Sequence, residues 1–478
     1  MKLDNLTLQT PYLDLDPIFY HEVSPTGLKN PILVSYNPEA ASLLGLNPEL
    51  LSAGEFEALL NGSLTLNGSR PYAMCYAGHQ FGHYVPRLGD GRAINLGWVN
   101  GWNLQLKGSG QTLYSRQGDG RAVLRSSIRE YLMSEAMHAL AIPTSRALAI
   151  ISSDENVARE KWERGSIVLR LSPSWIRFGS FEYFFHTHRF RELESLADFL
   201  LRESFPHLLD QEEPYRKMFR EIVKRTAELM AHWQAVGFNH GVMNTDNMSA
   251  AGLTIDYGPY AFLDTFESGY ICNHTDHEGR YSYDNQPRIG YWNLSRLAHA
   301  LSPLISADKL EMELDRYGEY FTGKLMDLLT QKLGLDTISD DDGDLLKSLF
   351  SVLENGRVDM TPFFRTLSRY NGDKAPLLAL TLAPNQLNEW LIRYDERLKR
   401  NTSSSSERHE KMVRTNPKYV LKNYILQEAI DLAEKGDFTL VNTLLKIAQN
   451  PYDEHPSYER YAGPTPLHFK NLKLSCSS

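Results

Sequence analysis

The sequence predicts an α+β protein in which a strand-rich part precedes a helix-rich part. Glycines and short alternating segments are concentrated before residue 172, and apolar residues recur with helical spacing after it. Strands and helices do not alternate along the chain, which argues against repeated β/α units. We expect a strand-rich lobe at 1–171, a helical lobe at 172–400 and an extension at 401–478 that begins with a serine-rich linker.

The composition of the 478 residues is ordinary for a soluble globular protein, with 42% hydrophobic and 23% charged residues. This excludes a mostly disordered, collagen-like or coiled-coil chain. The formal net charge of −9 argues against a general nucleic-acid surface. The chain has three cysteines, acidic residues near its start and no apolar run close to the ~18 residues of a membrane span. We therefore expect a cytoplasmic protein that binds neither membranes nor nucleic acid.

The elements follow from residue spacing. In the first part, alternation predicts strands at 92–96, 103–107, 145–151 and 166–171, and spacing predicts helices at 38–44 and 122–140. The second of these helices has an apolar residue at every fourth position from Leu124 to Leu140 and stops before Pro143. In the rest of the chain, periodicity predicts helices over 193–202, 215–236, 292–301, 309–329 and 419–434.

A tetrapeptide occurs twice in the first part. Gly89-Asp90-Gly91-Arg92 recurs as Gly118-Asp119-Gly120-Arg121. The glycines permit tight turns close to a ligand, free N–H groups in such a turn can bind phosphate, and the arginine that follows can hold it bidentately. Because Asp-Gly is also a common turn dipeptide, two ordinary hairpin turns are the alternative.

Lys107 ends a predicted strand, and a helix with two glutamates follows it. A glycine-rich turn, a strand ending in lysine and a helix bearing glutamate occur in this order in the small lobe of protein kinases. There the glutamate orients the lysine on nucleotide phosphates. Helical spacing places Glu135 on the apolar stripe with Ile128 and Glu130 nearly opposite. The spacing alone therefore favours Glu135 as the partner of Lys107.

The strongest signal begins at His240 and ends with Asp256 in an Asp-Tyr-Gly sequence. A kinase catalytic loop has a His, a base Asp two positions later and a metal-binding Asn five positions after that, and an Asp-aromatic-Gly sequence supplies a second metal ligand. Asn247 and Asp256 occupy the two ligand positions, and their oxygens suit Mg²⁺ or Mn²⁺. Val242 stands where the base would be, and Asp246 is the nearest carboxylate.

Arg170 and Arg177 lie near the expected boundary between the two lobes. An ordinary kinase binds adenine in this region and has no need for a pair of arginines there. Two arginines suggest that phosphate binds at this place instead. Surface ion pairing is the alternative explanation for each of them taken alone.

Together these motifs resemble those of the selenoprotein O family, in particular its bacterial members that carry cysteine. The resemblance extends over essentially the whole chain. The strings that carry it are Tyr76-Ala-Gly-His-Gln-Phe-Gly82, Leu88-Gly-Asp-Gly-Arg92, Tyr114-Ser-Arg-Gln-Gly-Asp-Gly-Arg-Ala-Val-Leu-Arg125, His240 to Asn247, Asp256-Tyr-Gly-Pro259, Cys272-Asn-His-Thr-Asp-His277, Tyr281-Ser-Tyr-Asp-Asn-Gln-Pro287 and Cys476-Ser-Ser478.

The resemblance implies a protein-kinase-like, bilobal fold that binds ATP in a flipped orientation. It implies transfer of AMP to Ser, Thr or Tyr hydroxyls of proteins, with release of pyrophosphate. Asp246 would be the base, Asn247 and Asp256 the metal ligands, and Glu130 rather than Glu135 the partner of Lys107. The other residues implied to bind the nucleotide are Gly89, Gly91, Arg92, Lys107, Asp119, Gly120, Arg170 and Arg177.

The resemblance also bears on the cysteines. Cys476 occupies the position where some family members carry selenocysteine, and a disulfide between it and Cys272 could gate the catalytic lobe. Composition alone indicates two reduced, unrelated thiols.

Three other functions remain open. The same pocket could use UTP with Mn²⁺, as a protein uridylyltransferase. A conventional kinase is a second alternative, against which Val242 and the arginine pair argue. A non-enzymatic, nucleotide-binding pseudokinase scaffold is the third, and it would need neither Lys107 nor a complete metal set.

Overall fold

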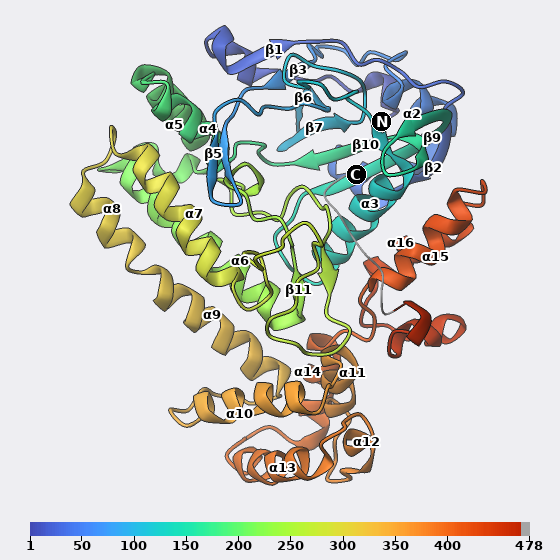
Figure 1. Cartoon of the computed structure of the whole chain (residues 1–478), viewed down its shortest axis with the longest axis vertical. Coiled ribbons are helices and arrows are strands. Elements are labelled where there is room, and N and C mark those ends of the chain that lie inside the picture. The colour runs from blue at the N-terminus through green and yellow to red at the C-terminus, as the bar shows by residue number, and fades with distance from the viewer. Residues whose placement is uncertain (470–478) are drawn as a thin grey trace.

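The computed structural model describes residues 1–469, in which a strand-rich region up to residue 172 is followed by a longer helical region (Figure 1). This mixed α and β composition, with most strands in the first part, is the one that the sequence predicts. No helix in the described residues is long and apolar enough to cross a membrane.

The strands are β1 (Tyr20–Glu22), β2 (Ile32–Tyr36), β3 (Tyr72–Met74), β4 (Gly78–Gln80), β5 (His83–Val85), β6 (Ala93–Val99), β7 (Trp102–Lys107), β8 (Ala122–Val123), β9 (Arg146–Ala158), β10 (Trp162–Ser172), β11 (Phe238–Asn239) and β12 (Ala261–Phe262). The α-helices are α1 (Pro38–Leu43), α2 (Ala53–Leu60), α3 (Leu124–Ala139), α4 (Phe178–His186), α5 (Phe190–Ser204), α6 (Pro214–Val236), α7 (Gln286–Leu301), α8 (Ala307–Leu314), α9 (Tyr317–Lys332), α10 (Asp342–Asn355), α11 (Met360–Leu367), α12 (Ala375–Leu378), α13 (Pro384–Leu398), α14 (Ser405–Thr415), α15 (Asn423–Ala433) and α16 (Thr439–Gln449).

The main sheet is antiparallel and follows the order β1-β3-β6-β7-β10-β9-β2, with β8 paired to β10. Because successive side chains point to opposite faces of a strand, β7 turns Leu104 and Leu106 toward the core formed with α1 and α2. The same alternation turns Gln105 and Lys107 to the other face, where α3 packs and the candidate site lies.

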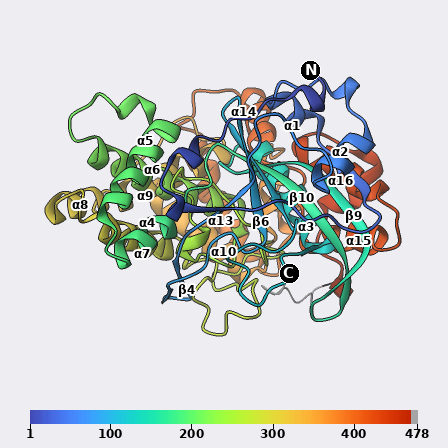
Figure 2. The same cartoon turned by 90° about the horizontal axis from the view of Figure 1, so that it is seen from above.

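Helix α3 is covered on two sides. It packs against β9 and β10 of the sheet on one side and against α15 and α16 on the other, so that both Glu130 and Glu135 are buried. Figure 2 shows α15 and α16 at the same end of the molecule as α1 and α2, and α4 to α9 at the opposite end. A helix covered on two sides has no single buried stripe, which limits what periodicity can decide about its residues.

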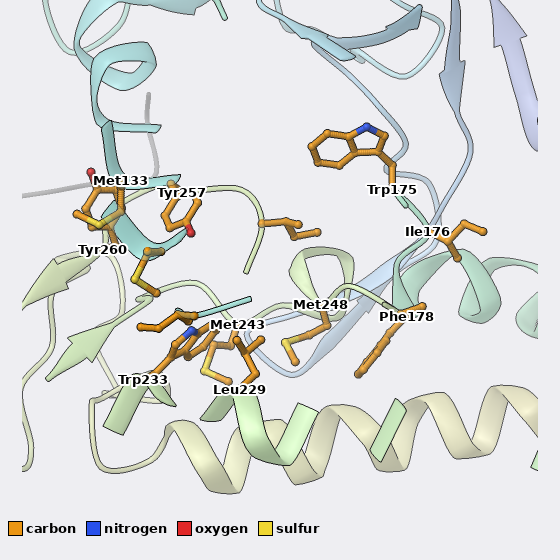
Figure 3. Close-up of a cluster of buried hydrophobic side chains, with 14 of the residues drawn as sticks. Met133, Trp175, Ile176, Phe178, Leu229, Trp233, Met243, Met248, Tyr257 and Tyr260 are labelled. Atoms are coloured by element: carbon orange, nitrogen blue, oxygen red, sulfur yellow. The ribbon is translucent and has the colours of Figure 1, made fainter. Parts of the chain in front are cut away.

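The helical region is built around α6, which begins at Pro214 and ends before Gly237, whose φ is +71°. Apolar side chains above α6 connect it with α3, with the segment after β10 and with the loop that carries Asp246 and Asn247 (Figure 3). The labelled members of this cluster are Met133, Trp175, Ile176, Phe178, Leu229, Trp233, Met243, Met248, Tyr257 and Tyr260. Met243 and Met248 thus anchor both ends of that loop in the core.

One predicted helix is wrong in its extent. The sequence predicted a single helix over 309–329, whereas the structure has α8 and α9, separated by a turn at Asp315 and Arg316. Both helices pack on α6, so the apolar spacing runs on through the turn and does not reveal it. Glu313, buried at the end of α8, accepts hydrogen bonds from Arg216 (2.8 Å) and Arg220 (2.7 Å) of α6.

The serine-rich run at 401–406 forms a helix cap rather than a free linker. Ser404 caps α14 in a reciprocal pair with Glu407, and Asp336 accepts the N–H groups of Thr402 and Ser403 at 2.8 Å each. Serine is common both in linkers and at helix N-caps, so composition does not separate the two.

Glu203, at the end of α5, joins this helix to the main sheet through its carboxyl group. Its Oε1 accepts a hydrogen bond from Asn103 Nδ2 at the start of β7 (2.9 Å), and burial raises its pKa from 4.5 to about 7 although hydrogen bonds from Ser174 and Asn103 oppose the shift. The unfolded chain ionises near pH 4.5 and the folded chain only near pH 7, so the free energy of unfolding should fall between these values by about 2–3 kcal/mol.

We expect Glu203→Gln to match the wild type in stability at pH 4.5 and to exceed it at pH 8, because the amide has the same shape and does not titrate. Chemical denaturation at the two pH values measures the difference. Glu194→Gln, an exposed change on the same helix, is the matched control and should show no such dependence. Equal free energies of unfolding for the wild type and Glu203→Gln at pH 8 would contradict the raised pKa of Glu203.

Candidate active site

A cavity of about 650 Å³ lies where the sheet meets the helical region. Both tetrapeptides line this cavity, although 29 positions separate them in the chain. The cavity is also lined by every residue predicted to bind the nucleotide, act as the base or bind the metal, except Glu130. The predicted residues that line it are Gly89, Gly91, Arg92, Lys107, Asp119, Gly120, Arg170, Arg177, Asp246, Asn247 and Asp256.

Asp256 is the centre of a buried charge network. Its Oδ1 accepts a hydrogen bond from Arg170 Nη1 at 2.6 Å, its Oδ2 accepts one from Arg177 Nη1, and Lys107 Nζ is 3.7 Å from Oδ1. Burial by itself would raise the pKa of Asp256, but the charges of Arg177, Arg170 and Lys107 outweigh it and hold the pKa well below 3.8. The carboxylate is therefore ionised and shared by three cations.

The backbone of Asp256 is in the left-handed region, with φ of +56°. This conformation costs a residue with a side chain about 1 kcal/mol and is tolerated where surrounding contacts impose it. Here the two arginines supply those contacts.

Lys107 is paired with Glu130, as the family resemblance implies and against the helical spacing. Lys107 Nζ donates to Glu130 Oε2 at 2.6 Å, and Arg170 Nη1 donates to Glu130 Oε1 at 2.6 Å. Glu135 instead accepts two hydrogen bonds from Arg146, at 2.8 and 2.6 Å. The spacing argument fails because both glutamates meet the main sheet, Glu130 at Lys107 of β7 and Glu135 at Arg146 of β9, so that burial alone does not choose between them.

The two tetrapeptides differ in the roles of their aspartates. Asp90 is buried and accepts hydrogen bonds from the Met74 N–H (3.0 Å), Tyr76 and Asn95, so it holds its turn to the sheet. Asp119 lies at the mouth of the cavity and pairs with Arg159 at 2.7 Å. Neither copy is a hairpin turn, because β5 does not pair with β6 and β7 does not pair with β8; both copies lie in loops that line the cavity.

The arginines that end the two tetrapeptides also differ, because one is held by hydrogen bonds and the other is not. Arg121 is fixed by Glu155 and by the carbonyl groups of Thr26 and Gly27. In the part of the chain that the structure describes, the guanidinium of Arg92 has no hydrogen bond or ion pair, although it lines the cavity. Arg92 is therefore the cation of the pair that is available to an anionic ligand.

Asp246 lies on a short 3₁₀ turn, Thr245–Asn247, and is buried. Burial raises its pKa to about 7, although the charge of Arg177 and a hydrogen bond from Gln80 oppose the shift. Gln80 Nε2 donates to Oδ2 at 3.2 Å, and Oδ1 has no partner within residues 1–469. One oxygen of this carboxylate is thus oriented by Gln80, and the other is buried without a hydrogen-bond partner in the described residues.

Val242 and Asn247 lie beside Asp246. Asn247 Nδ2 donates to the carbonyl of Val242 at 3.2 Å, which leaves the amide oxygen of Asn247 for another ligand. The imidazole of His240 accepts the N–H of Val242 and contacts the carbonyl of Ile255 at 3.0 Å. Burial lowers the pKa of His240, so this side chain holds the loop as a neutral group.

The hairpin β4–β5 contains the functional residues that motif reasoning missed. Besides Gln80, it contributes Gly78, at which a Cβ atom would lie 2.7 Å from Asp246 Oδ1. Glu182 of α4 fixes the hairpin to the loop, since its carboxylate contacts His79 Nδ1 at 2.8 Å and accepts from Thr245 Oγ1 at 2.6 Å. Tyr76–Gly82 is one of the strings that carry the family resemblance, and its two glycines are the sequence signal of a close backbone approach.

Cys272 is buried beside the loop. Its Sγ is 3.6 Å from the carbonyl oxygen of Asn239 and would be 2.5 Å from a Cβ atom at Gly241. Cys476 lies outside the described residues, so the pairing of these two cysteines stays a prediction.

Comparison with known proteins gives the family. A sequence model described as "Protein adenylyltransferase SelO" matches residues 2–449. The chain belongs to this family. Two SelO relatives named protein nucleotidyltransferase YdiU, from Myxococcus xanthus (strain DK1622) and Pseudomonas fluorescens (strain Pf0-1), are each 48% identical to it, and the alignments cover 100% of this chain and 99% of each relative.

A third relative of the same name, from Thioalkalivibrio sulfidiphilus (strain HL-EbGR7), is 47% identical, with 100% of both chains covered. The resemblance to the SelO family inferred from the motifs is therefore confirmed over nearly the whole sequence. The cavity described above lies within the part of the chain that the SelO model matches.

Gly78→Ala tests the contact between the hairpin and Asp246. The added methyl group would meet the carboxylate and its Cβ atom at 2.7 and 3.0 Å, so the loop must shift. We expect a loss of nucleotidyl transfer of about 100-fold, typical of a misplacement near 1 Å, with the fold retained. Gly54→Ala, on the exposed start of α2 with no atom within 4 Å, is the control. Transfer by Gly78→Ala at the wild-type rate would show that this contact does not position Asp246.

Proposed function

We propose that the protein is a nucleotidyltransferase that moves AMP from ATP to Ser, Thr or Tyr hydroxyls of proteins and releases pyrophosphate. The observation that carries the proposal is the convergence of Lys107, Arg170 and Arg177 on Asp256 at the cavity, next to an apolar Val242 and a buried Asp246. Membership of the SelO family, whose description names adenylyl transfer, supports the same reaction.

The fold proposed for this reaction is that of a protein kinase with two lobes. The ion pair between Lys107 and Glu130, a strand-end lysine with a helix glutamate, corresponds to the pair that orients the phosphates in kinases. Asn247 and Asp256 follow in the order of the kinase metal ligands. Val242 cannot accept a proton, which argues against the kinase mechanism and in favour of a reversed nucleotide.

The charge network suits a triphosphate. Lys107, Arg170 and Arg177 share Glu130 and Asp256, and Asp90 lies 3.9 Å from Arg177 as a third carboxylate. Arg92, unpaired in the described structure, adds a fourth cation, so this group of side chains carries a net positive charge. Phosphate oxygens would compete with the carboxylates for the arginines. With the γ-phosphate held by Lys107, Arg170 and Arg177, the α-phosphate would face Asp246, and the charge on departing pyrophosphate would be stabilised.

The residues present fit a divalent cation. Asp256 offers hard carboxylate oxygens, and the amide oxygen of Asn247 is free of the bond that its nitrogen makes. Two such protein ligands with substrate phosphates and water are a usual set for Mg²⁺, and Mn²⁺ accepts the same donors. When bound, the cation would offset charge on the polyphosphate.

Asp246 is proposed as the general base. The acceptor hydroxyl oxygen forms a bond to the α-phosphorus, the bond from that phosphorus to the bridging oxygen breaks, and pyrophosphate leaves with the electron pair. The hydroxyl proton passes to Asp246 Oδ1, while Gln80 and Arg177, whose Nη1 donates to the Asp246 carbonyl at 2.6 Å, keep the group in place.

The test uses purified protein, a generic protein acceptor and ATP labelled at either the α- or the γ-phosphorus, with Mg²⁺ or Mn²⁺. We expect protein labelling from the α position alone. We expect Asp246→Ala to lower the rate by about 10²–10⁴-fold with ATP binding retained, since a general base contributes this much. Asp431→Asn, an exposed carboxylate on α15, is the matched control.

Label from the γ position alone would indicate a kinase and would overturn the proposal. ATP binding without transfer of either label would favour a scaffold. A parallel reaction with α-labelled UTP separates adenylyl from uridylyl transfer, and full activity of Asp246→Ala would exclude Asp246 as the base.

A further inference from the structure

Three arginines near the candidate site have no carboxylate partner. Most of the arginines in this acidic chain make ion pairs, whereas Arg280, Arg288 and Arg296 lie within 4 Å of no carboxylate oxygen anywhere in residues 1–469. The Nε and Nη2 atoms of Arg280 are also buried without any hydrogen-bond partner. Buried guanidinium nitrogens without a hydrogen bond, such as these two atoms of Arg280, are unusual because their desolvation is not compensated. Arg288 is exposed, and Arg296 donates to the hydroxyl of Ser295.

The three arginines form one surface with Trp292. Arg288, Trp292 and Arg296 are spaced four residues apart on α7, so they share one side of the helix. The guanidinium of Arg280 lies 4.5 Å from the Trp292 ring centre, and that of Arg296 lies 5.2 Å from it. We call Arg280, Arg288, Trp292 and Arg296 the α7 arginine surface.

The carboxylates nearest to this surface in the sequence are Asp276, Glu278 and Asp284, and within residues 1–469 none of them forms an ion pair with the three arginines. Asp276 is buried and accepts the N–H groups of Arg280 and Tyr281, at 3.0 and 2.7 Å. Asp284 accepts a hydrogen bond from Ser282 at 2.7 Å. The positive charge of the surface is therefore left for a group that does not belong to the described chain.

The α7 arginine surface borders the hairpin that contacts Asp246. The Trp292 ring lies edge-on to His79 of β4 at 5.4 Å, and a Cβ atom at Gly82 would lie 3.3 Å from the Arg280 guanidinium. The hairpin descends beside α4 and α7 in Figure 1. Gln80 of the same hairpin reaches Asp246, so a chain lying on the surface can place a hydroxyl near that carboxylate.

We propose that the α7 arginine surface binds an acidic segment of the acceptor protein, next to the hydroxyl that receives the nucleotide. The proposal rests on the proposed function, since it concerns the acceptor of that reaction. Guanidinium groups bind carboxylates bidentately, and a tryptophan flanked by arginines supplies contact area of the kind that dominates protein interfaces.

The charge balance favours this partner over a basic or neutral one. An acidic segment would pair three cations that have no carboxylate partner in the described structure, whereas a basic segment would meet them with like charge. Electrostatic pairing at an interface rim acts mainly on encounter and on the choice of partner, so its effect belongs in the KM for the acceptor.

The experiment uses the full-length protein, α-labelled ATP and three synthetic peptides that have one Tyr flanked by Glu, Ala or Lys. We expect kcat/KM for the Glu peptide to exceed that for the Lys peptide by at least about tenfold, and the advantage to shrink as salt rises. The double variant Arg288→Glu/Arg296→Glu should lose about tenfold in kcat/KM for the Glu peptide through KM for the peptide, with KM for ATP unchanged.

Arg191→Glu/Arg202→Glu is the matched control, because both arginines are exposed on α5, lack ion pairs within the described structure and give the same change in net charge. This control variant should leave kcat/KM for all three peptides at the wild-type value. Equal kcat/KM for the Glu and Lys peptides, or equal losses in the two double variants, would overturn the inference while adenylyl transfer stands. No labelling of any peptide or protein by the wild type would instead refute the proposed function.

Discussion

The Asp256 carboxylate lies between two buried arginines, Arg170 on β10 of the main sheet and Arg177 at the start of α4. Asp256 belongs to the helical region, so its ion pair with Arg170 joins the two parts of the molecule at the cavity. Removing one member of a buried, hydrogen-bonded pair typically costs about 3–5 kcal/mol, because the other charge remains without a partner. The left-handed backbone of Asp256, the position of Lys107 and the cavity itself all depend on this arrangement.

The same charges make the site suitable for chemistry. Glu130 and Asp256 keep three cations in place without neutralising them, so that incoming phosphate meets preorganised donors rather than mobile side chains. Asp246 is in a different electrostatic environment, since burial dominates over the attraction of Arg177 and raises its pKa to about 7. Two aspartates ten residues apart thus differ in ionisation because one has two arginines on its carboxylate and the other has a glutamine amide.

The β4–β5 hairpin connects this site with the surface around α7. Gly78 and Gln80 contact Asp246, His79 is held through Glu182 to the neighbouring Thr245, and Gly82 covers Arg280. A short hairpin with one glycine at its start and another in its turn can lie this close to the loop and to Arg280 because no side chain intervenes at those positions. The proposed base and the proposed acceptor surface are therefore linked by one small element.

Local patterns in the sequence determined the strands around Lys107 and Arg170, the long helix α3, and the loop with Asp246, Asn247 and Asp256, because alternation, helical spacing and motif order are properties of neighbouring residues. Tertiary structure decided the rest. Glu130 rather than Glu135 meets Lys107 because the two buried glutamates of α3 meet different strands of the sheet, and Glu135 pairs with Arg146 of β9. The break between α8 and α9 is hidden because both helices pack on α6. Gln80, Glu182 and the unpaired arginines of α7 acquire their importance only from residues far away in the chain, which spacing along a sequence does not encode.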